Sequence, residues 1–88
     1  MNMQTRFMNR IAETLKGLEV VNNPEWANMG ILFVYRKEEG DVPHLVIKYS
    51  FQSGYATFEA STGKHHLVTF AKGETVKAFF SWLADATR

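Results

Sequence analysis

Two adjacent histidines, His65 and His66, follow a Gly63-Lys64 pair in the stretch STGKHHLVTF. Imidazole side chains serve as general bases, metal ligands and pH switches. Residues 65–72 are rich in β-branched and aromatic side chains, which predicts a strand. Successive side chains of a strand point to opposite faces, so the two rings cannot share one metal ion or act on one substrate atom. We therefore expect no metal site or catalytic site from this pair.

The third histidine, His44, opens another predicted strand at residues 44–51. In an antiparallel meander one strand separates it from residues 65–72, which leaves the histidines about 9–10 Å apart. A zinc–nitrogen bond is only about 2.0–2.1 Å long, and further ligands are not evident. The chain has no cysteine, so thiolate ligands and disulfides are excluded. We expect neither a metal nor a cofactor.

The Gly63-Lys64 pair does not fit a phosphate-binding loop. That signature needs a glycine five residues before its second glycine and a Ser or Thr after its lysine, in a loop between a strand and a helix. Position 58 is Phe, position 65 is His, and the segment is predicted to be a hairpin. We therefore expect no nucleotide-binding loop here.

Serines and carboxylates give no stronger case for catalysis. None of Ser50, Ser53 and Ser61 lies in a G-x-S-x-G turn between a strand and a helix, where such a serine is exposed for attack. Glu38 and Glu39 occupy a charged hairpin tip, where carboxylates are solvated. We expect a protein that is not an enzyme.

Length and charge narrow the protein class. The 88 residues, 45% of them hydrophobic and 22% charged, predict a single globular domain over 1–88. Ten basic and nine acidic residues give no net field, so binding to nucleic acid or to an anionic membrane would need a local patch. No apolar run approaches the roughly 20 residues of a membrane span, and the polar start MNMQTRFMNR has no signal-peptide core. We expect a cytoplasmic protein without membrane contact.

Hydrophobic spacing predicts a helix at each end of the chain. In residues 3–16 the apolar side chains recur at helical spacing, and Gly17 suits the end of that helix. The segment GETVKAFFSWLADATR, from residue 73, carries a second stripe of this kind. The two stripes consist of Phe7, Met8, Ile11 and Leu15, and of Val76, Phe79, Phe80 and Leu83.

Four extended segments lie between the helices, at 31–37, 44–51, 55–60 and 65–72. The breaks between them are short and contain glycine, as in antiparallel hairpins. Residues 18–30, with Asn23-Pro24, are interpreted as a connection. The predicted fold is α+β, in the order α-β-β-β-β-α, with a four-stranded antiparallel meander and both helices packed on one face.

Alternation assigns the strand residues to two faces of the sheet. Both sides of the first and fourth strands are apolar, so their faces are ambiguous; we assign Ile31, Phe33, Tyr35, Val68 and Phe70 to the core. The far face then carries Leu32, Val34, Arg36, Val46, Lys48, Tyr55, Leu67 and Thr69. Two alternatives remain, in which residues 18–30 cover this face or the first strand is inverted.

A solvated sheet face is normally polar, so an apolar far face indicates an interface. The simplest partner would be a second copy, which predicts a possible homodimer. Trp26 is either a lid on the core or an exposed anchor, and Trp82 either seals the core edge or faces a partner. The predicted partner-binding residues are Trp26, Leu32, Val34, Arg36, Val46, Lys48, Tyr55, Leu67 and Trp82.

Two functions follow from this surface. The first is a protein-binding module of the adaptor or inhibitor type, a kind of small protein often encoded by phages and other mobile elements. The second is suggested by residues 31–87, whose order of four strands and a helix resembles the repeat of PUR and whirly proteins. That resemblance implies binding of single-stranded nucleic acid by stacking and by basic groups, through Tyr55, Arg36, Lys48, Lys64 and His65.

Overall fold

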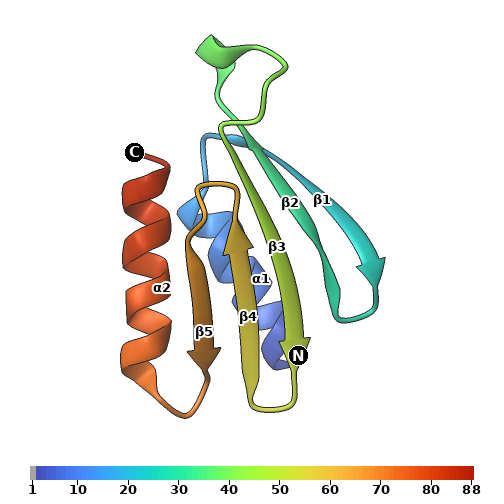
Figure 1. Ribbon diagram of the computed structural model, residues 1–88, viewed down its shortest axis with the longest axis vertical. Coiled ribbons are helices and arrows are strands. Elements are labelled where there is room, and N and C mark those ends of the chain that lie inside the picture. The colour runs from blue at the N-terminus through green and yellow to red at the C-terminus, as the bar shows by residue number, and fades with distance from the viewer. Residues whose placement is uncertain (1) are drawn as a thin grey trace.

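The computed structural model describes residues 2–88, which form two helices and a five-stranded antiparallel sheet. The strands lie across the sheet in chain order, from β1 to β5 (Figure 1). The predicted α+β class and antiparallel sheet are therefore confirmed. The elements are α1 (Met3–Thr14), β1 (Glu19–Trp26), β2 (Met29–Tyr35), a 3₁₀ turn at Lys37–Glu39, β3 (Leu45–Gln52), β4 (Tyr55–Ala60), β5 (His65–Thr69) and α2 (Gly73–Ala86).

The prediction of four strands is wrong, because the segment interpreted as a connection forms β1. This strand pairs with β2 from Glu19 opposite Tyr35 to Trp26 opposite Met29. Pro24 and two asparagines weaken the strand signal in the sequence, but β1 is an edge strand, where a residue without an N–H is tolerated. The register shifts between Pro24 and Trp26, so the strand also contains an irregularity.

The face assigned to β2 is also wrong. Leu32 and Val34 are 2% and 0% exposed, whereas Phe33 and its neighbours Ile31 and Tyr35 are half-buried. Pairing with β3 sets this orientation, because Leu32 lies opposite the buried Ile47. Leu32 and Val34 therefore belong to the core and not to the far face, where the prediction placed them.

On β5 the assignment of Val68 to the core is confirmed, since this side chain is fully buried. Phe70 lies just beyond the strand, half-buried and packed against the core. On β3 alternation places Leu45, Ile47, Tyr49 and Phe51 on one side of the strand, and all four are buried.

Aromatic rings join the helices to the sheet. The ring of Phe58 on β4 stacks on Phe7 of α1 at 5.6 Å between centroids and on Phe79 of α2 at 4.2 Å. In Figure 1, α1 passes behind the strands and α2 runs beside β5. The apolar stripes predicted for both helices supply buried residues to this core.

Candidate partner-binding face

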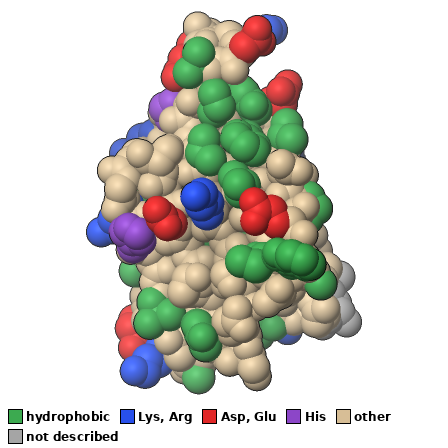
Figure 2. Space-filling model, turned by 45° about the vertical axis from the view of Figure 1, so that its right-hand side comes forward, with side chains coloured by type: hydrophobic (Ala, Val, Ile, Leu, Met, Phe, Trp, Pro, Cys, Tyr) green, Lys and Arg blue, Asp and Glu red, His purple; other side chains and the backbone are tan. Residues whose placement is uncertain are grey.

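The sheet face away from the buried core is called the outer face. Val21 lies opposite Phe33, and Phe33 lies opposite Val46, so three strands contribute neighbouring apolar side chains to one row of this face. Ile31 and Tyr35 flank Phe33 along β2 on the same side. These five residues, Val21, Ile31, Phe33, Tyr35 and Val46, are called the apolar patch. Figure 2 shows hydrophobic side chains gathered on this part of the surface, with charged side chains beside them.

A charged row limits the apolar patch on one side. Lys48 lies opposite Ile31 on β2 and opposite Glu59 on β4, and Glu59 in turn lies opposite His65 on β5. All three of these polar side chains are exposed. On this side the patch borders Lys48 directly, and Glu59 follows on the next strand.

A hollow of about 770 Å³ lies at the other end of the patch. Val21 and Tyr35 line it together with the acidic residues Glu19, Glu38 and Asp41. Its wall also includes Gly17, Leu18, Arg36, Lys37 and Gly40. Apolar and acidic residues are thus adjacent in the lining of this hollow.

Arg36 was predicted to lie on the far face; it lines the hollow, but its guanidinium is directed to the loop after β2 and to the end of α2. Its guanidinium lies 3.7 Å from the carboxylate of Glu38 and 3.8 Å from that of Glu39, and it donates a hydrogen bond to the carbonyl of Arg88. Alternation places Arg36 on the same side of the chain as the buried Val34, which explains this direction.

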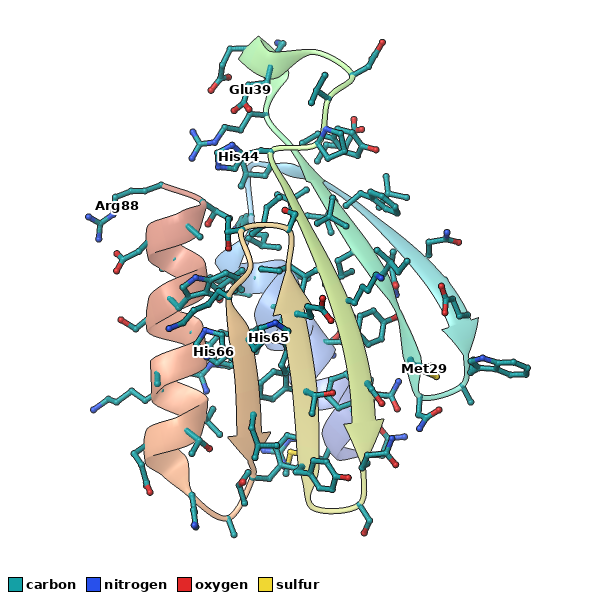
Figure 3. All side chains as sticks on the ribbon, viewed as in Figure 1. Met29, Glu39, His44, His65, His66 and Arg88 are labelled. Carbon is teal, nitrogen blue, oxygen red and sulfur yellow. The ribbon has the colours of Figure 1, made fainter. Side chains whose placement is uncertain are left out.

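His44 reaches the same end of α2 (Figure 3). Its Nδ1 lies 2.9 Å from a carboxylate oxygen of Glu39, and its Nε2 lies 3.0 Å from the carbonyl oxygen of Ala86. The last carbonyls of a helix have no partner within the helix and carry partial negative charge. His44 and Arg36 therefore tie the loop after β2 to the end of α2.

The two adjacent histidines point to opposite faces, as predicted. His65 is exposed, and His66 is half-buried with its ring 4.9 Å from Trp82 and 5.5 Å from Phe79. Burial lowers the pKa of His66 from its ordinary value of 6.5, and the positive charge of Lys64 lowers it further. Its Nε2 is buried without a hydrogen-bond partner among residues 2–88. The ring therefore acts as part of the core edge.

The two tryptophans have different environments. Trp82 is half-buried and packs against the core beside His66, so it seals the core edge. Trp26 is 70% exposed at the end of β1, which excludes the lid interpretation for this residue.

The remaining predicted residues lie on the outer face but do not form one cluster. Val46 belongs to the apolar patch, and Lys48 borders it. Tyr55, 41% exposed, begins β4 opposite Thr69, and Leu67, 61% exposed, lies opposite Thr57 in the middle of β5. The expected contiguous surface is therefore divided by polar side chains.

Sequence reasoning missed four members of the apolar patch. Ile31, Phe33 and Tyr35 follow from the corrected orientation of β2, and Val21 follows from β1. The pair Val20-Val21 was the available signal, because adjacent β-branched residues favour a strand.

No group of three or more acidic or histidine side chains that could hold a metal ion occurs within residues 2–88. No helix in the same part of the chain is long and apolar enough to cross a membrane. No family model matches the sequence, and no curated protein or solved structure matches it.

Proposed function

We propose that this protein is a non-enzymatic protein-binding module of the adaptor or inhibitor type, and that it binds its partner through the apolar patch. The observation that carries the proposal is the row formed by Val21, Phe33 and Val46. These three apolar side chains come from three neighbouring strands and lie on the face away from the core. Contiguous apolar surface bordered by charge is typical of protein interfaces. Val21 is 45% exposed, so a partner can reach the row directly.

We also infer that both helices cover the same face of the sheet. Phe58 is buried, and its ring meets Phe7 from α1 and Phe79 from α2. A side chain projects from one face of its strand, so this double contact favours two helices on that face. The outer face is then left for a partner.

Trp26 supports the same proposal. It lies opposite Met29 at the end of β1, and 70% of its surface is exposed. Large aromatic side chains supply much of the binding energy at protein interfaces. We therefore assign Trp26 as an anchor at the margin of the interface.

A pull-down from the native host tests this function. The wild-type protein is compared with Phe33→Ser, which shortens the central patch residue, and with Thr57→Ala, an exposed position outside the patch. We expect a defined protein to be retained by the wild type and by Thr57→Ala, and lost with Phe33→Ser. Circular dichroism checks that both variants are folded.

The same pull-down is repeated with nuclease and at two salt concentrations. Retention that disappears with nuclease and falls steeply with salt would replace the proposal with single-stranded nucleic-acid binding. Sedimentation of the purified protein measures self-association through the same face. A dimer that dissociates with Phe33→Ser would identify the protein partner as a second copy.

A further inference from the structure

We propose that the occupant of the apolar patch is a cationic, amphipathic polypeptide segment, in which Lys or Arg side chains flank apolar ones. This inference rests on the proposed function and specifies the chemistry of the partner. Three features carry it: the uneven distribution of charge along the chain, the position of the carboxylates around the patch, and the hollow next to Tyr35.

The charges of the chain are separated although their sum is close to zero. Residues 19–60, which supply β1 to β4, contain six acidic and three basic residues. Residues 1–18 and 61–88, which supply α1, β5 and α2, contain three acidic and seven basic residues. The part of the chain that carries the apolar patch, together with the loop between β2 and β3, is therefore the acidic part of the molecule.

Carboxylates lie at both ends of the patch. Glu19 is opposite Tyr35 at one end, and Asp41 lines the hollow beside the same tyrosine. Glu59 is at the other end, opposite Lys48. These three acidic side chains are exposed, so they interact electrostatically with any partner that binds at the patch.

The nearby cations only partly compensate the negative charge of these carboxylates. Arg36 is directed to Glu38, to Glu39 and to the end of α2, so its charge is used within the molecule. Lys37 remains at the hollow, and Lys48 lies beside Glu59. The residual charge around the patch is negative, which attracts a cationic segment and repels phosphate groups and anionic lipid.

The hollow suits the side chain of such a segment. Its lining includes the apolar side chains of Val21 and Tyr35 together with the carboxylates of Glu19 and Asp41. Lysine and arginine pack their methylene stems on apolar surface and keep the charged head near polar groups. A cationic, amphipathic segment would place an apolar side chain on Phe33 and a Lys or Arg side chain in the hollow. It would then make the apolar contact and the charged contact at the same time.

A second copy is the weaker choice. Two outer faces packed against each other would bring acidic rims together, which is unfavourable. A basic helical surface placed on the outer face of another copy would be a heterologous contact, and such contacts form rings or open filaments. The first arrangement is a two-fold dimer with unfavourable charge, and the second does not close as a dimer.

Three labelled probes test the inference by fluorescence anisotropy with the full chain. The first is an amphipathic Leu/Lys peptide of about 14 residues, close to four helical turns. The second is the same peptide with Glu in place of Lys, and the third is an oligothymidylate. We expect the Leu/Lys peptide to bind at least roughly tenfold more tightly than the other two, with an affinity that falls as salt rises.

Paired charge variants then locate the contact. Glu19→Gln combined with Asp41→Asn is expected to weaken binding of the Leu/Lys peptide by roughly three- to tenfold. Glu13→Gln combined with Glu74→Gln removes the same charge from the two helices and should leave binding unchanged. Phe33→Ser should abolish binding, and the amide signals of Val21, Phe33 and Val46 should shift when the peptide is added.

The outcomes separate this inference from the proposed function. Equal binding of the Lys and Glu peptides, lost with Phe33→Ser, would overturn the cationic partner and keep a protein-binding patch. Tight oligothymidylate binding, or peptide binding unaffected by Phe33→Ser, would overturn both. Equal weakening by the two charge pairs would show a net-charge effect and would also overturn the inference.

Discussion

Tyr49 on β3 lies directly opposite Gly30 on β2, and its phenol reaches across that glycine to β1. The hydroxyl donates a hydrogen bond of 2.7 Å to Oδ1 of Asn22. A Cβ atom on residue 30 would lie 2.6 Å from this hydroxyl and 2.8 Å from the carbonyl oxygen of Asn23. The missing side chain of Gly30 therefore leaves room for Tyr49 to cross β2, and the hydrogen bond to Asn22 links β3 to β1, the strand that carries Val21.

Gly30→Ala is expected to destabilise the protein. The added methyl group would meet backbone atoms of Asn23 and Pro24, which cannot move as easily as a side chain. Overpacking of this kind costs about 1–3 kcal/mol of unfolding free energy. Urea unfolding measures the change. Gly73→Ala is the matched control, because no atom lies within 4 Å of the added carbon and the position starts α2; an equal loss there would contradict the explanation.

Tyr49→Phe should cost about 1 kcal/mol, because it removes one partly buried hydrogen bond to Asn22. It also removes the atom nearest to the carbon added in Gly30→Ala. The double variant is therefore expected to lose less stability than the two single losses added together. A double-mutant cycle measures this coupling, and simple additivity would show that the hydroxyl does not restrict residue 30.

Stability is expected to decrease as the pH falls below 6.5, through His66. Its pKa in the folded protein is below the ordinary value of 6.5, because burial and then Lys64 disfavour the imidazolium. The unfolded chain therefore binds more protons in this window, and the free energy of unfolding falls as pH falls. His66→Phe should flatten this dependence around and below pH 6.5. His65→Phe, at an exposed position, should keep it, and an unchanged slope in His66→Phe would refute the assignment.

Arg36→Ala is expected to loosen the end of α2. The guanidinium donates to the carbonyl of Arg88 and lies near Glu38 and Glu39, so its loss frees both the helix end and the loop. Amide hydrogen exchange should accelerate in the last turn of α2 while the sheet stays protected. Lys37→Ala, on the exposed neighbour, is the control. Unchanged exchange in Arg36→Ala would mean that His44 alone holds this contact.

Substitutions on β2, β3 and β5 distinguish the two faces of the sheet. Val46→Glu should leave the protein folded and remove partner binding, because the side chain is half-buried in the apolar patch. Leu67→Glu should leave both folding and binding intact, because Leu67 lies outside that patch and is 61% exposed. Leu32→Glu should unfold the protein, since it buries an unpaired charge. Thermal melts and the pull-down measure these effects, and a folded Leu32→Glu would show that the orientation of β2 is wrong.

Local periodicity was sufficient where one side of an element is clearly apolar. The helix stripe containing Phe79 and Leu83, and the alternation from Leu45 to Phe51, each follow from spacing alone. The opposite directions of His65 and His66 follow from the same alternation. These elements carry enough information in a short window to specify both their type and their buried side.

The sequence by itself determined the α+β class, the two amphipathic helices, the inward side of β3 and the separation of the histidines. Only the tertiary structure decided that residues 19–26 join the sheet and that Leu32 and Val34 face the core. Asn22 and Pro24 weaken the local strand signal, whereas β2 is apolar on both sides and so gives two equally good alternations. Pairing with a neighbouring strand resolves both cases, because register and the close approach at Gly30 depend on residues distant in the chain.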